Sequence, residues 1–151
     1  MKKSARCLLL CLAFFLPRAV RAEDGAMNVA LPLTYTLKVG SLSIKSADVS
    51  LTRRSTYVHV LFDAFPYRDA LQVDSPNPKP LEPVVKALVK GFVLKSLPAT
   101  KLAKVDVVEL LDRDDYGAPR WDSVKWLGKY EVKITKHGLS IRLLSGPDTD
   151  H

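Results

Sequence analysis

Cysteine is almost absent from this chain, and both copies lie close to the N-terminus. The 151 residues include only Cys7 and Cys11. The rest of the sequence has no thiol, which excludes a disulfide framework, a cysteine-rich zinc site and a cysteine nucleophile there. Histidine is scarce as well, and His59, His137 and His151 are far apart in the sequence. A histidine-based metal site is therefore not predicted.

The short motifs of common enzyme classes are missing too. The sequence has no Gly-x-Ser-x-Gly, no His-Glu-x-x-His, no phosphate-cradling glycine loop and no Cys-x-x-Cys. His59 and Asp63 share one face of a predicted strand, but at about 3.3 Å per residue they lie roughly 13 Å apart. That separation is too large for a catalytic dyad. No catalytic residue and no cofactor is therefore predicted.

Residues 1–22 have the layout of a secretory signal peptide. Three basic residues precede an apolar run at residues 7–16, CLLLCLAFFL, and a small-residue cleavage site ends at Ala22. The run is about half of the roughly 20 residues that a membrane span needs. We therefore expect a signal peptide over residues 1–22 and a single globular α+β domain over residues 23–151. This domain is expected in the periplasm or outside the cell.

Removal of that leader changes the charge of the protein. The whole chain carries a formal net charge of +7, but residues 1–22 contribute five basic residues and no acidic ones. Residues 23–151 keep 18 basic and 16 acidic residues, a net charge of +2. So small an excess does not predict a nucleic-acid partner. No apolar run in residues 23–151 is long enough to cross a bilayer.

One stretch, LEPVVKALVKGFVLKSL at residues 81–97, shows a clear helical pattern after the leader. Its apolar side chains recur at i, i+3, i+4, i+7 and i+8, which is typical of a helix with one buried face. Pro98 predicts that the helix ends near Leu97. The charged side chains lie off the apolar stripe, at Lys86, Lys90 and Lys95.

The remaining sequence predicts strands, because apolar and polar residues alternate along it. Six strands are expected, with a β-bulge where the alternation of the second slips phase. Residues 66–80 are rich in proline and predict a stiff connector. The pattern predicts an α+β fold, with a mostly antiparallel curved sheet in β-β-β-α-β-β-β order packed on one central helix. The strands are expected at residues 29–39, 42–51, 57–65, 105–111, 124–134 and 139–143.

Aromatic residues gather in the second half of the chain. Trp126 and Tyr130 alternate with charged residues in the strand expected at 124–134. They are predicted to share its apolar face and to pack on the helix. Tyr116 and Trp121 flank an acidic, turn-rich segment instead, and are harder to bury.

That acidic segment, residues 112–122, is the candidate partner-binding surface. It joins two predicted strands and is longer than the two to five residues of a tight hairpin. Loops on a rigid scaffold often carry binding sites, and aromatic and arginine side chains often anchor interfaces. As alternatives, the segment is a solvated hairpin connector rich in turn-forming residues, the loop folds its aromatics onto the sheet as a lid, or it binds calcium weakly. No metal site is predicted, because Tyr116 and Ser123 stand at ligand positions of the calcium-loop motif. The candidate residues are Asp114, Asp115, Tyr116, Arg120 and Trp121.

The pattern favours a non-enzymatic envelope accessory module that binds a protein partner. One alternative is a carrier that holds an apolar or lipid ligand between helix and sheet. Another is a hydrolase whose residues converge only in three dimensions. A solid core with an exposed aromatic loop would favour the first, a large apolar cavity the second, and a cleft that joins His59 to carboxylates the third. No motif singles out a family.

Overall fold

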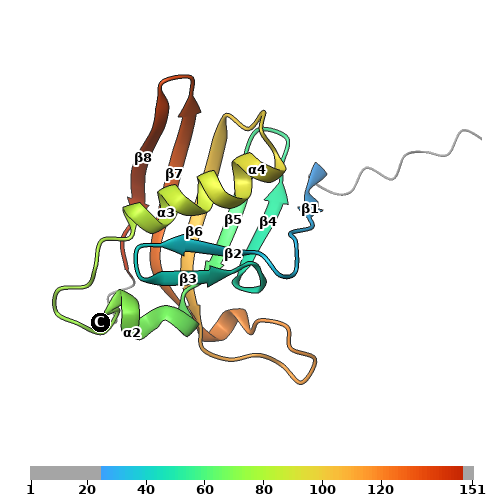
Figure 1. Ribbon diagram of the computed structural model, residues 1–151. Coiled ribbons are helices and arrows are strands. Elements are labelled where there is room, and N and C mark those ends of the chain that lie inside the picture. Colours follow the sequence, from blue (N-terminus) through green and yellow to red (C-terminus); the bar gives the residue numbers. More distant parts are fainter. Residues whose placement is uncertain (1–24, 148–151) are drawn as a thin grey trace, which may run out of the picture.

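The computed structural model describes residues 25–147 (Figure 1). The predicted signal peptide lies outside these residues. Within them the chain is α+β with a mostly antiparallel sheet, as the sequence predicts. None of the helices in this described part is long and apolar enough to cross a membrane.

A six-stranded sheet forms the main layer. Its strands are β1 (Met27–Val29), β4 (Val49–Arg53), β5 (Val58–Asp63), β6 (Leu102–Leu110), β7 (Val124–Thr135) and β8 (Gly138–Ser145). They lie in the order β1-β4-β5-β6-β7-β8. Neighbours are antiparallel except β5 and β6, which are parallel. This exception follows from the chain order, because a helical crossover joins these two strands.

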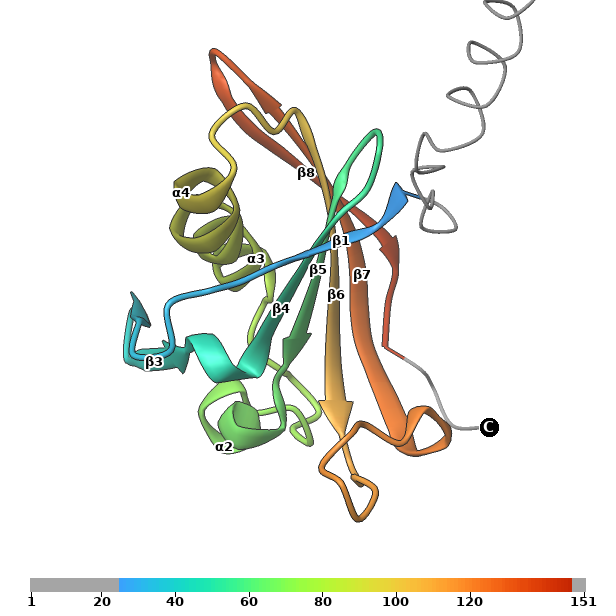
Figure 2. The same cartoon turned by 90° about the vertical axis from the view of Figure 1, so that its right-hand side faces the viewer.

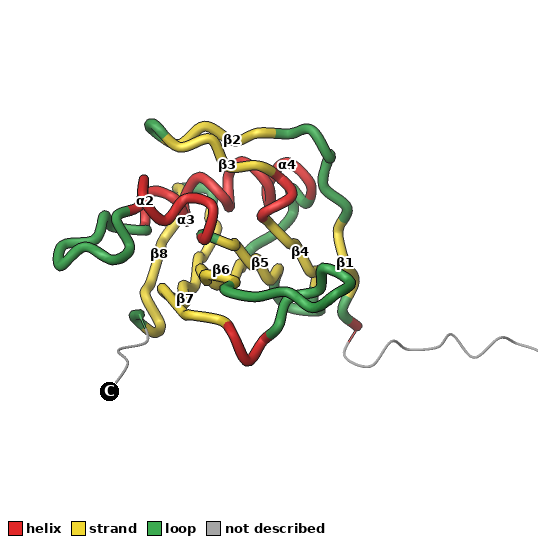
Figure 3. Tube along the Cα trace, turned by 90° about the horizontal axis from the view of Figure 1, so that it is seen from below, coloured by secondary structure: helices red, strands yellow, loops and turns green. Residues whose placement is uncertain are grey.

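One face of this sheet is covered by a helical segment and a two-stranded hairpin (Figures 1 and 2). The helix begins as α3 (Glu82–Leu88), continues as the π-helical stretch η5 (Val89–Val93) and ends as α4 (Leu94–Ser96). The hairpin consists of β2 (Thr36–Val39) and β3 (Leu42–Lys45). Seen from below, helix and hairpin both lie above the main sheet (Figure 3).

The helix buries the stripe that its sequence predicts. Val85, Leu88 and Val89 have no exposed surface, and Phe92 has almost none. The lysines off the stripe are all exposed. Phe92 also meets the ring of Tyr35 edge-on, with centroids 5.3 Å apart. These helical residues pack in one cluster with buried strand residues.

Two strand predictions in the first half of the chain are wrong in detail. Residues 29–39 form parts of two strands in different sheets, since β1 pairs with β4 whereas β2 pairs with β3. The phase slip within residues 42–51 is not a β-bulge. A 3-10 turn, Ser46–Asp48, separates β3 from β4 there and carries the chain from the hairpin into the main sheet.

The connector at residues 66–80 is only partly extended. Its start forms a 3-10 turn, Phe65–Tyr67, and the short helix α2 (Arg68–Leu71). Gln72 ends this helix with a left-handed φ of 54°, a conformation that often closes a helix. The proline-rich part of the connector follows and leads to α3.

Trp126 and Tyr130 do not share a face, contrary to the sequence prediction. In the pairing of β6 with β7, Val107 lies opposite Gly128 but Val108 lies opposite Trp126, so Leu127 is an extra residue. This β-bulge reverses the alternation along β7. Tyr130 is consequently buried in the core, whereas Trp126 is only half-buried and lies outside it.

Candidate binding sites

The loop at residues 112–122 is an ordered extension of the β6–β7 hairpin. The amide of Asp114 donates to the carbonyl of Ala118 at 2.9 Å, and Arg113 forms an isolated bridge with Pro119. At the base of the loop, the amide of Leu111 donates to the carbonyl of Ser123 at 3.0 Å. The loop therefore has a defined backbone conformation.

Two side chains hold the tip and the base of this loop. The Oδ1 atom of Asp114 accepts hydrogen bonds from the amides of Tyr116 (2.9 Å) and Ala118 (2.8 Å). Arg120 donates to Asp112 at 3.1 Å and to Asp122 at 3.2 Å. The hydrogen bond and charge of Asp122, together with the charge of Asp112, raise the pKa of the Arg120 guanidinium above its usual value. Asp114 and Arg120 thus stabilise the loop itself.

The aromatic side chains of the loop point away from this framework. Tyr116 is 96% exposed and Trp121 is 58% exposed. A lid would bury both against the sheet, so the lid alternative is wrong for Tyr116. The structure brings Asp114, Asp115 and Tyr116 together at the tip, whereas Arg120 and Trp121 lie nearer the base.

A buried carboxylate connects the loop to the end of β5. Asp63 accepts hydrogen bonds from the amides of Phe65 (3.0 Å) and Leu110 (3.1 Å) through Oδ1. Its Oδ2 atom lies 3.5 Å from Nη2 of Arg113, at the start of the loop. Because Asp63 is buried, these charge-assisted bonds are stronger than they would be in water. They fix the direction in which the loop leaves the sheet.

The aspartates of the loop do not converge on one point. Among residues 25–147, no group of three or more Asp, Glu, His or Cys side chains is arranged to hold a metal ion. Asp112 and Asp122 instead share Arg120, and Asp114 bonds to backbone amides. The arrangement therefore gives no support to the calcium alternative.

A histidine–carboxylate pair lies on the sheet face opposite the helix. Nε2 of His59 is 2.7 Å from Oδ2 of Asp106, and both side chains are partly exposed. The sequence did not predict this pair, because Asp106 stands on β6 and only the parallel pairing brings it beside β5. In the described part of the chain no serine or threonine hydroxyl bonds to His59. The pair therefore lacks the nucleophile that a hydrolase triad needs.

An apolar pocket of about 410 Å³ opens where the start of α3 meets β7 and β8. Leu71, Leu127 and Tyr130 form buried parts of its wall. The Tyr130 ring lies across Gly128, where an added Cβ would be 2.7 Å from a ring carbon. Burial, and to a smaller extent the charge of Glu82, raise the pKa of the Tyr130 hydroxyl.

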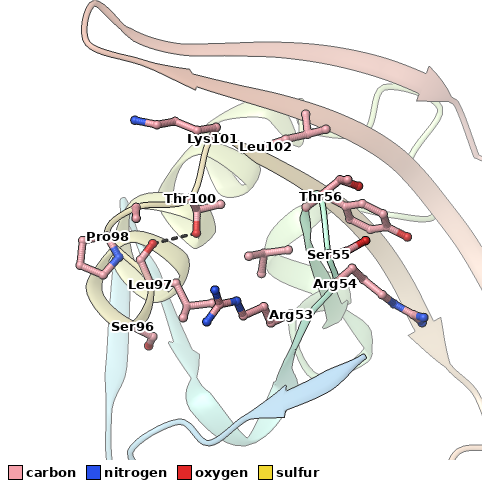
Figure 4. Close-up of a pocket in the computed structure, with 13 residues that line it drawn as sticks. Arg53, Arg54, Ser55, Thr56, Ser96, Leu97, Pro98, Thr100, Lys101 and Leu102 are labelled. Atoms are coloured by element: carbon pink, nitrogen blue, oxygen red, sulfur yellow. Dashed lines mark hydrogen bonds between the residues drawn. The ribbon is translucent and has the colours of Figure 1, made fainter. Parts of the chain in front are cut away.

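A second pocket, of about 360 Å³, lies between the β4–β5 turn and the loop that joins α4 to β6 (Figure 4). Its lining contains Arg53, Arg54 and Lys101, several hydroxyl groups and no carboxylate. Thr100 donates its hydroxyl hydrogen to the carbonyl of Leu97 at 2.7 Å and closes the end of the helix.

The chain has no significant match among protein-family models, curated proteins or solved structures.

Proposed function

We propose that this protein is a non-enzymatic module of the bacterial envelope that binds a protein partner through the 112–122 loop. The observation that carries the proposal is the exposure of Tyr116 and Trp121 on a loop that its own hydrogen bonds hold in place. Large exposed aromatics have no role in the stability of a solvated connector. They are common anchors of protein interfaces.

The ordered backbone of the loop supports the same proposal. Binding by a flexible loop costs conformational entropy, whereas a loop that is already ordered loses less on association. The segment 112–122 carries four carboxylates and two guanidiniums, so its net charge is negative. A partner with a basic surface around an apolar pocket would therefore complement it.

Site-specific crosslinking in living cells tests this function directly. A photoreactive phenylalanine analogue replaces Tyr116 in one strain, and Leu33, which is 95% exposed outside the loop, in a control strain. We expect one protein to crosslink from position 116 and not from position 33. Adding Trp121→Ala should then weaken that crosslink at least tenfold without changing the melting temperature. Identical crosslinks from both positions, or none from either, would contradict the proposal.

A second candidate function, a carrier of an apolar ligand, is favoured by the pocket beside α3. Tyr130 is only 5% exposed, and it forms part of the pocket wall together with Leu71 and Leu127. A ligand with an apolar body and one acceptor atom, such as a fatty acid ester, would contact these apolar walls and accept a hydrogen bond from the Tyr130 hydroxyl.

Two variants of the pocket test the carrier function. Tyr130→Phe removes only the hydroxyl, and Gly128→Ala displaces the ring. Each should weaken binding of a fluorescent fatty acid ester about five- to tenfold, which is the loss expected for one hydrogen bond. Tyr57→Phe, outside this pocket, is the matched control and should bind like the native protein. Equal affinity in all four proteins would exclude this pocket as the carrier site.

A further inference from the structure

The pocket of Figure 4 lies at the opposite end of the sheet from the 112–122 loop. It lies at the start of the parallel strands β5 and β6, whereas the loop follows the end of β6. Figure 1 shows the β4–β5 turn and the end of α4 at the top and the loop at the bottom. The two sites therefore belong to different ends of the same pair of strands.

The cations of this pocket have no carboxylate partners. Arg53, Arg54 and Lys101 form no ion pair within the described residues, and the Nε atom of Arg54 is buried without a hydrogen-bond partner. Five other cations among the described residues are paired with acidic side chains. These are Arg68, Arg113, Arg120, Lys125 and Arg142. The pocket thus gathers positive charge that the protein does not neutralise itself.

Three cations line the pocket, but their side chains point in different directions. Figure 4 shows the side chain of Arg53 extending from the end of β4 toward Leu97, whereas the side chains of Arg54 and Lys101 extend away from that of Arg53. Ser55 and Ser96 add hydroxyl donors from the two facing segments. A guanidinium and hydroxyl groups around one space form a donor set that suits an oxyanion, and the charge of Lys101 at the edge adds to the attraction.

Apolar side chains occupy the rest of the wall. Val58, Leu97, Pro98 and Leu102 line the pocket beside the cations. Its volume falls in the usual range for small-molecule sites, roughly 300–1,000 Å³. A bare inorganic ion would leave most of this space empty. The lining therefore favours an anionic group attached to an organic body.

We propose that this pocket binds a phosphate ester, with the phosphate at the Arg53 guanidinium and the organic part against Leu97 and Pro98. Arg54 and Lys101 contribute through their charges from the edge of the pocket. A free sugar or glycerol phosphate and the head group of an anionic phospholipid offer the same chemistry. The site is independent of the 112–122 loop, and its experiment does not require the protein partner.

Calorimetric titration with glycerol 3-phosphate, at constant ionic strength, tests the site in the soluble protein. The variant R53Q/K101Q removes both cations. K86Q/K90Q removes two exposed helix charges outside the pocket and serves as the matched control. We expect saturable binding to the native protein and the control, with at least a tenfold loss in R53Q/K101Q. The milder R53K keeps the charge but loses the guanidinium fork, and an intermediate affinity is expected.

Sedimentation with vesicles distinguishes the two sources of the phosphate. Binding to phosphatidylglycerol vesicles but not phosphatidylcholine vesicles, lost in R53Q/K101Q and kept in K86Q/K90Q, would identify the lipid head group. Binding of glycerol 3-phosphate with no vesicle binding would identify a soluble ester. The proposal is overturned if neither probe binds. It is also overturned if both double variants lose affinity equally, because that result would show attraction by net charge alone.

Discussion

Gly91 offers a test of how the β2–β3 hairpin sits on the helix. A Cβ atom added at this position would lie 2.4 Å from Cδ1 of Leu37, and 3.3 Å from its Cγ. Rotation of the leucine methyl groups alone would not relieve both contacts. Gly91→Ala should therefore push β2 away from the helix, and overpacking of this kind costs about 1–3 kcal/mol. Alanine gains about 0.8–1 kcal/mol over glycine in a helix, so the expected net loss is up to about 2 kcal/mol.

The double variant Leu37→Ala/Gly91→Ala tests whether the Leu37 side chain causes this loss of stability. Once the leucine atoms are gone, Gly91→Ala keeps only the gain in helix propensity and should stabilise the protein by up to about 1 kcal/mol. Its effect thus changes sign between the two backgrounds, a coupling that a double-mutant cycle measures by urea unfolding. If Gly91→Ala stabilised the native background as well, the hairpin would not press on the helix at this point.

Three further predictions concern the core, the pH dependence and the processing of the chain. Leu88→Ala should lower the free energy of unfolding by about 2–5 kcal/mol, and Lys90→Ala should leave it nearly unchanged; equal shifts of the denaturant midpoint would refute the assigned helix face. Burial and a hydrogen bond to Asp48 raise the pKa of Tyr67 to about 12, above its usual 10.0. The pKa of Tyr67 is higher in the folded state than in the unfolded state. The contribution of this side chain to the free energy of unfolding is therefore full below pH 10 and is lost as the pH rises toward 12. The native protein should therefore lose more stability than Tyr67→Phe over this range, and parallel unfolding curves would contradict this. The exported protein should begin at Glu23, which intact mass measures, and a chain that keeps its cysteines would disprove the cleavage.

Elements with a local signal could be predicted from the sequence. The helix needs only its own 3.6-residue repeat, and β7 and β8 need only alternation and a short turn. The loop at 112–122 was predicted from its turn-forming residues, and its exposure follows from the same polarity. The tip residues Asp114 and Tyr116 were also candidates from the sequence, because polar and aromatic types together are unusual in a connector.

Features that depend on pairing between distant segments could not be predicted. Alternation has the same period in any sheet, so it does not show that β2 leaves the main sheet for β3. The extra residue Leu127 forms a β-bulge that turns Trp126 to the sheet face opposite Tyr130. Nothing in the local sequence indicates this bulge. The pair of His59 and Asp106 exists only because β5 and β6 run parallel. The pockets likewise form between segments that are far apart in the sequence.

The net charge of residues 23–151 shows why composition alone missed the basic pocket. A charge of +2 indicates no electrostatic partner when it is averaged over the domain. In physiological salt, however, a charge acts over only about 8 Å, so a ligand responds to the groups around it and not to the total. The fold places Asp114 and Asp115 at one end of the sheet, and Arg53 and Lys101 at the other. Because the opposite charges are separated by the length of β5 and β6, neither end neutralises the other. A nearly neutral domain therefore carries an acidic surface at one end of its sheet and a basic pocket at the other.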